Sequence, residues 1–162
     1  MERSPQNSST LSRRLLRYGP LLLWTGVIWF ASTGGFSAGN TSRVIRPLLL
    51  WLFPDTTEPT LTAVHFYIRK AAHFIEYAIL ALIARRAFIS SSRDSLRDHW
   101  FASSLVFVTL VATIDELHQS FVPVRTGSIY DIFIDLAGGL TVLGVCWLYQ
   151  RRQQARVGAS GG

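Results

Sequence analysis

The chain has 162 residues, enough for one domain, and 49% of them are hydrophobic. Its single cysteine, Cys146, excludes an intrachain disulfide bond and a cysteine-based metal site. The formal charge is +6, but the basic residues stand in short clusters beside apolar blocks, which fits membrane topology and argues against a nucleic-acid partner.

The apolar residues gather into blocks of roughly 15–20, the length that a helix needs to cross the core of a bilayer. We therefore predict an all-α integral membrane protein, with one bundle of four transmembrane helices in residues 18–150. The polar ends, residues 1–17 and 151–162, show no periodicity. We expect both to be mobile cytoplasmic tails.

The first predicted helix covers residues 18–32 and follows a cluster of arginines. A basic start before an apolar core also describes a cleavable signal peptide. The bulky Trp24, Trp29 and Phe30 argue against cleavage, because tryptophan near a helix end suits the interface between membrane and water. We expect this helix to be retained.

The other three predicted helices cover residues 64–84, 100–121 and 129–149. The second could begin as early as residue 60, behind Pro59, because proline is favoured in the first turn. Between the first and second helices, residues 44–54 are apolar but too short to span a bilayer. We expect them to form an interfacial or re-entrant segment in the first extracytoplasmic loop.

Four spans place both termini on one side of the membrane. The two tails and the loop between the second and third helices carry eleven of the sixteen basic residues. Because cytoplasmic loops are enriched in lysine and arginine, the termini are predicted to be cytoplasmic.

Ionisable residues lie at a similar depth on three of these helices. Lys70, Asp115 and Asp135 are each about fifteen residues from the cytoplasmic end of their helix, roughly 22–24 Å at a rise of 1.5 Å per residue. Lys70 is also the only lysine in the chain. A lysine can lose its proton when buried, whereas an arginine effectively cannot. A lone charge near mid-membrane costs about 2.5–3.5 kcal/mol on insertion scales, so we expect these groups to face one another inside the bundle.

Several polar residues and glycines follow one another in a characteristic order. That order is Lys70-x-x-His73-x-x-x-Tyr77, Asp115-Glu116-x-x-Gln119, Pro123-x-Arg125, Asp131 and Gly138-x-x-x-x-x-Gly144. It resembles the VanZ-like family, small helical membrane proteins named for a teicoplanin-resistance accessory protein. Val124 departs from the family pattern, where glycine is common, and Asp135 stands where asparagine is common.

The resemblance implies a protein of the bacterial cytoplasmic membrane, with a role in the cell envelope and in low-level glycopeptide resistance. It does not supply a reaction, so no catalytic residue is assigned. The expected partners are membrane lipids and a cell-wall precursor or other lipid-linked ligand. The predicted ligand-binding set is Lys70, His73, Tyr77, Asp115, Glu116, Gln119, Arg125, Asp131 and Asp135.

Other chemistry is compatible with these residues. Two pairs, His73 with Glu76 and Glu116 with His118, have helical metal-ligand spacing. Positive charge from Lys70 and Arg125 would repel a cation, so we predict no metal ion and no other cofactor.

Three alternatives to ligand binding stay open. Clustered carboxylates with one histidine and one lysine suit acid–base catalysis on a lipid-linked substrate. The same groups are also compatible with a structural ion-pair network or with a small proton-coupled transporter.

Overall fold

The computed structural model describes residues 5–33, 38–123 and 127–160. These residues form α-helices joined by short turns, and no strand occurs among them. The all-α prediction is therefore confirmed. The helices are α1 (Pro5–Ala31), α2 (Ala38–Leu52), α3 (Glu58–Ile89), α4 (Asp94–Asp98), α5 (Trp100–Ser120) and α6 (Ile129–Ser160).

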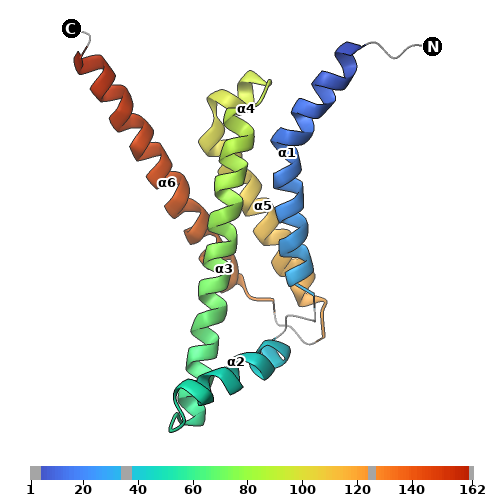
Figure 1. The fold of residues 1–162 in the computed structure, drawn as a ribbon, viewed down its shortest axis with the longest axis vertical. Helices are drawn as coiled ribbons and strands as arrows, with labels where there is room; N and C mark the ends of the chain where they lie inside the picture. The colour runs from blue at the N-terminus through green and yellow to red at the C-terminus, as the bar shows by residue number, and fades with distance from the viewer. Residues whose placement is uncertain (1–4, 34–37, 124–126, 161–162) are drawn as a thin grey trace.

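Helix α3 runs the full height of the molecule and contacts each of the other five helices (Figure 1). Its start follows from local sequence, because Thr57 is the N-cap and a proline, Pro59, stands in the first turn. Its buried face includes Tyr77, Leu80 and Ala84, which recur at helical spacing. Small residues on this face let neighbouring helices come close.

The closest approach is between α3 and α6. A methyl group at Gly138 would overlap the backbone carbonyl group of Phe74 on α3. At the next residue, a methyl group on Gly139 would come within 3.0 Å of Val108 Cγ1 on α5. These two glycines therefore let α6 pack closely against both α3 and α5.

The predicted bounds agree best with the structure where α5 ends and α6 begins. Helix α5 ends within one residue of the prediction, and α6 begins at the predicted residue. Two helices extend beyond the predicted spans, since α1 already begins at Pro5 and α6 continues to Ser160. Once an apolar segment has nucleated a helix, extending it through good helix formers such as Arg, Gln and Ala costs little.

Helix α2 lies across the end of α3 that is far from the chain termini (Figure 1). It has 15 residues, which at 1.5 Å each gives roughly 22 Å, less than the core of a bilayer. The apolar side of α2 is exposed, as at Val44, Leu48 and Trp51. Its length agrees with the predicted short segment, and its placement at a membrane surface stays a prediction.

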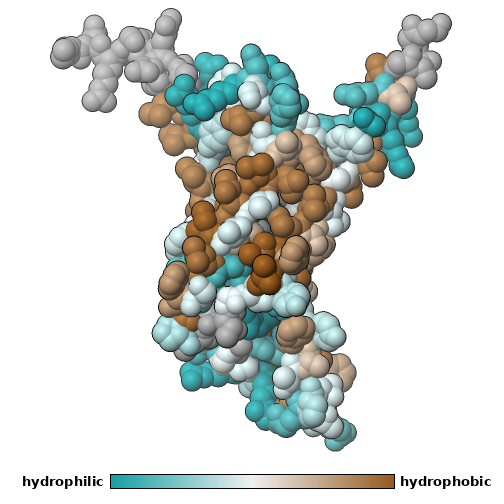
Figure 2. Space-filling view, turned by 180° about the vertical axis from the view of Figure 1, so that it is seen from behind, coloured by the Kyte–Doolittle hydropathy of each residue, from teal (hydrophilic) through white to brown (hydrophobic). Residues whose placement is uncertain are grey.

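Within the described residues, two helices are long and apolar enough to cross a membrane by length and composition, Trp100–Ser120 and Ile129–Val157. This is fewer than the four predicted spans. Charged residues interrupt the apolar run of α3, namely Arg69, Lys70 and Glu76. Figure 2 shows apolar side chains over the middle of one face and hydrophilic ones towards both ends. That distribution is consistent with a membrane protein.

The start of α1, the short α4 and the end of α6 lie at one end of the molecule, and α2 lies at the other (Figure 1). The arginine-rich segments of the chain therefore share an end. Polar residues continue the buried faces of the long helices towards the α2 end, as in α5, where Asp115 and Gln119 follow Val108 and Ala112.

Candidate functional site

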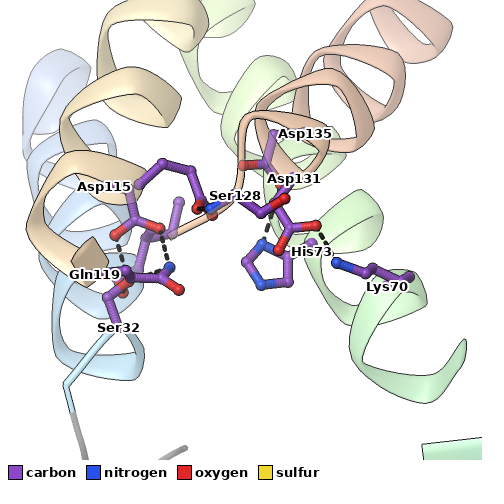
Figure 3. A network of polar contacts seen from close by, with 10 residues as sticks. Ser32, Lys70, His73, Asp115, Gln119, Ser128, Asp131 and Asp135 are labelled. Atoms are coloured by element: carbon purple, nitrogen blue, oxygen red, sulfur yellow. Dashed lines mark hydrogen bonds and ion pairs between the residues drawn. The ribbon is translucent and has the colours of Figure 1, made fainter. Parts of the chain in front are cut away.

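Side chains from four segments meet near the α2 end of the bundle (Figure 3). Helices α3, α5 and α6 contribute most of them, and one comes from the residue after α1. We call this group the polar cluster; its members are Ser32, Lys70, His73, Asp115, Glu116, Gln119, Asp131 and Asp135.

Two contacts join α3 to α6. Lys70 Nζ forms an ion pair with Asp131 Oδ1, and His73 Nδ1 lies 3.2 Å from Asp135 Oδ1. The partners are spaced i, i+3 on α3 and i, i+4 on α6, so the two contacts stack one turn apart. Asp135 is fully buried, whereas the side chain of Lys70 is 23% exposed. Lys70 Nζ also lies 5.1 Å from the centroid of the Phe66 ring, at the edge of the cluster.

Asp115 makes a separate set of contacts between α5 and the end of α1. Ser32 Oγ donates to Asp115 Oδ1, and Gln119 Nε2 donates to Asp115 Oδ2 over 2.9 Å. All three residues are buried. Both carboxylate oxygens of Asp115 therefore accept a hydrogen bond from a neighbouring side chain. Ser32 was absent from the predicted set, because a serine at the end of an apolar helix carries no distinguishing signal.

Glu116 connects the end of α5 to the start of α6. Its Oε2 accepts a hydrogen bond from the backbone N–H of Ser128 over 2.7 Å. Its second oxygen, Oε1, has no hydrogen-bond partner among the described residues, and the same is true of Asp135 Oδ2. Both side chains are buried, with relative exposures of 4% and 0%. Each of these two acids therefore has one oxygen left unsatisfied.

His73, Glu116 and Asp135 converge. Each offers one ligand atom, and the three atoms lie within 4.8 Å of one another. One imidazole and two carboxylates are a donor set that divalent cations accept. The two residue pairs with helical metal-ligand spacing in the sequence, His73 with Glu76 and Glu116 with His118, do not form this group. The ring of His118 instead packs on Trp29, with 4.9 Å between their centroids.

Tyr77 lies one turn along α3 from His73 and is fully buried. Its hydroxyl makes no hydrogen bond in the part of the chain that the structure describes. Its ring belongs to the apolar core with Leu80 and Val108. Arg125, the remaining member of the predicted set, lies outside the described residues.

A cavity of about 130 Å³ adjoins the cluster between α1, α2, α3 and α5. His73 and Gln119 line it from the cluster side. Arg69 and Glu76 add one charge of each sign to its wall, and neither was in the predicted set. Spacing offered a signal for Arg69, which lies four residues before His73 and therefore shares a face of α3 with it.

The expected meeting of acids and bases is thus present for Asp131 and Asp135, which face Lys70 and His73 from another helix. Asp115 differs, because its hydrogen bonds go to Ser32 and Gln119. The role of these side chains in binding a ligand stays a prediction.

The chain is similar to one protein family over most of its length. A family model described as VanZ/LLP1 matches residues 18–150, which include the described members of the cluster. No curated protein and no solved structure matches the chain.

Proposed function

The chain belongs to the VanZ/LLP1 family, and on that premise we propose that it binds a cell-wall or lipid-linked ligand through the polar cluster and the cavity beside it. The binding takes place in the bacterial cytoplasmic membrane and alters sensitivity to teicoplanin at a low level. Family membership supports the general role in the cell envelope. The ligand class and the antibiotic are the proposal.

The proposed topology has four spans, α1, α3, α5 and α6. Both termini are cytoplasmic, and α2 lies on the extracytoplasmic surface. Arginines at the start of α1, around α4 and at the end of α6 support this orientation, because cytoplasmic segments are enriched in basic residues. The polar cluster then opens towards the outer leaflet, where lipid-linked cell-wall precursors are used.

The observation that carries the proposal is a cavity with a half-buried arginine in its wall. Arg69 lines this cavity and makes no ion pair with the described residues. A guanidinium presents a planar fork of donors that suits phosphate or carboxylate groups. A charged head group entering from the lipid would therefore meet Arg69 and His73, one turn apart on the same face of α3.

The hydrogen bonding of the cluster argues against a purely structural role. A network that serves only folding satisfies its buried polar atoms, because each unpartnered one costs about 1–3 kcal/mol. Glu116 Oε1 and Asp135 Oδ2 are both buried and have no partner among the described residues. Such atoms are more typical of a site that accepts a further group.

The test is mass spectrometry of lipids that co-purify with the protein from a teicoplanin-exposed host. We expect an anionic, polyprenyl-type lipid to be enriched with wild type and depleted with Arg69→Gln. Arg43→Gln is the matched control, because Arg43 is a cation on α2 that does not line the cavity. Equal lipid recovery from all three proteins contradicts the proposal. Conversion of the bound lipid to a new product would instead favour the enzyme alternative.

A further inference from the structure

The polar cluster holds more negative than positive charge among the described residues. Its carboxylates are Asp115, Glu116, Asp131 and Asp135, and its only lysine or arginine is Lys70. Lys70 is bound to Asp131, so its charge is largely neutralised there and repels a cation only weakly. Glu116 and Asp135 have no lysine or arginine partner among the described residues. Buried carboxylates in this position need a positive group beside them.

The geometry around these two acids suits a single ion. Ligand atoms of His73, Glu116 and Asp135 lie within 4.8 Å of one another. One ion with bonds of about 2.0–2.5 Å can bridge atoms up to roughly 4–5 Å apart. His73 Nδ1 and Asp135 Oδ1 are 3.2 Å apart. That separation is close to the edge of a tetrahedron with bonds of about 2.0–2.1 Å, roughly 3.3 Å.

A second observation points to the same place. Asp135 is fully buried, and its Oδ2 has no hydrogen-bond partner in the described part of the chain. Glu116 is 4% exposed, and its Oε1 likewise has no hydrogen-bond partner among the described residues. The third member, His73, turns its Nδ1 towards Asp135 Oδ1. Buried, unpartnered acceptors are costly unless a cation or a proton satisfies them.

We propose that His73, Glu116 and Asp135 bind a divalent transition-metal ion. Three protein ligands leave at least one coordination position open. That position is available to an anionic head group, and this part of the inference rests on the proposed function. Nitrogen and oxygen donors without thiolate favour Zn²⁺ or Mn²⁺ over Cu⁺, and the imidazole disfavours Mg²⁺.

The fold holds the three ligands in place from three helices. Gly138 brings α6 against α3, which sets the distance between Asp135 and His73. The Ser128 N–H fixes one oxygen of Glu116 and leaves the other for the ion. The Lys70–Asp131 ion pair lies one turn away and joins the same two helices, α3 and α6.

The experiment measures metal content of the full chain without any lipid ligand. Detergent-purified protein is stripped with a chelator, titrated with micromolar ZnCl₂ or MnCl₂, separated from free ion and analysed by plasma mass spectrometry. Wild type is expected to retain close to one ion per chain and to unfold at a higher temperature with the metal than without it.

Glu116→Gln and Asp135→Asn are expected to weaken metal binding at least about tenfold. Both retain a side-chain acceptor for their present partners, which limits their effect on folding. Asp115→Asn is the matched control, because Asp115 is a similarly buried neighbour outside the three-ligand group. Failure of folded wild type to retain either ion overturns the assignment. Equal loss of metal by Asp115→Asn and Asp135→Asn overturns it too.

Lipid recovery is measured separately, so the two proposals can fail independently. Metal retained without co-purified lipid supports the metal site and contradicts the proposed ligand. Lipid retained by a folded protein that binds no metal overturns the metal site alone.

Discussion

Lys70 on α3 is bound to Asp131 in the first turn of α6, although 61 residues separate them in the chain. The contact ties the middle of the second predicted span to the beginning of the fourth. It lies one turn from His73 and Asp135, so the two contacts together fix the rotation of α6 about its own axis.

Removing the cation of this pair should destabilise the protein. We expect Lys70→Met to lower the free energy of unfolding by about 1–3 kcal/mol, because Asp131 is left buried without its partner. The expected loss stays below that of a fully buried pair because Lys70 is 23% exposed. Unfolding in detergent measures the effect.

The matched control is the exposed Arg46–Glu58 pair, where Arg46→Met should cost less than about 1 kcal/mol. Equal losses for the two substitutions would show that the Lys70–Asp131 pair adds nothing beyond a surface contact. A further variant, Lys70→Arg, separates charge from residue type. If Lys70→Arg retains as much co-purified lipid as wild type, a positive charge is sufficient at this position and a lysine is not required.

Packing between α3 and α6 should depend on one glycine. Gly138→Ala places a methyl group against the backbone of Phe74, and the forced separation of the helices should cost about 1–3 kcal/mol. Gly144 lies on the same helix, and a methyl group there would meet nothing within 4 Å, so Gly144→Ala should be neutral or stabilising by up to about 1 kcal/mol. Thermal unfolding of both variants checks this, and a stable Gly138→Ala protein would contradict the close approach.

The Ser32–Asp115 hydrogen bond should contribute to stability without contributing to metal binding. Ser32→Ala removes the donor to a buried carboxylate oxygen, with an expected loss of about 1–3 kcal/mol. Thr33→Ala is the control, since its hydroxyl bonds to the carbonyl of Phe30 at an exposed position. Melting temperature and zinc content are measured on the same samples. A loss of zinc in Ser32→Ala would place Asp115 in the metal site and contradict the three-ligand assignment.

The proposed orientation can be tested by labelling in intact cells. In a Cys146→Ser background, Asp55→Cys in the turn after α2 should react with a thiol reagent that does not cross membranes, because that turn is exposed and extracytoplasmic in the proposal. Ser92→Cys, exposed beside α4 at the opposite end, should react only after the cells are opened. The reverse pattern would invert the topology.

Local sequence predicted the all-α class well, and it also predicted the end of α5 and the start of α6. The start of α6 and the end of α5 follow from apolar runs bounded by polar residues, and such signals need no knowledge of distant contacts. The placing of His73 on the buried face of α3 followed equally from the helical period. The polar extensions of α1 and α6 were not predicted, because a polar helix that extends an apolar one leaves no hydrophobic pattern to detect.

The sequence by itself determined which residues share a face of each helix and roughly how deep they lie, because both follow from the pitch and rise of one helix. Only the tertiary structure decided which acid meets which base. Asp115 joins Ser32 from 83 residues away, and Glu116 turns to the start of α6 beside His73 and Asp135. Those choices depend on how closely and at what rotation the helices pack. That packing is set by small residues such as Gly138 and by the apolar core around Tyr77, whose contacts are distributed over the whole chain.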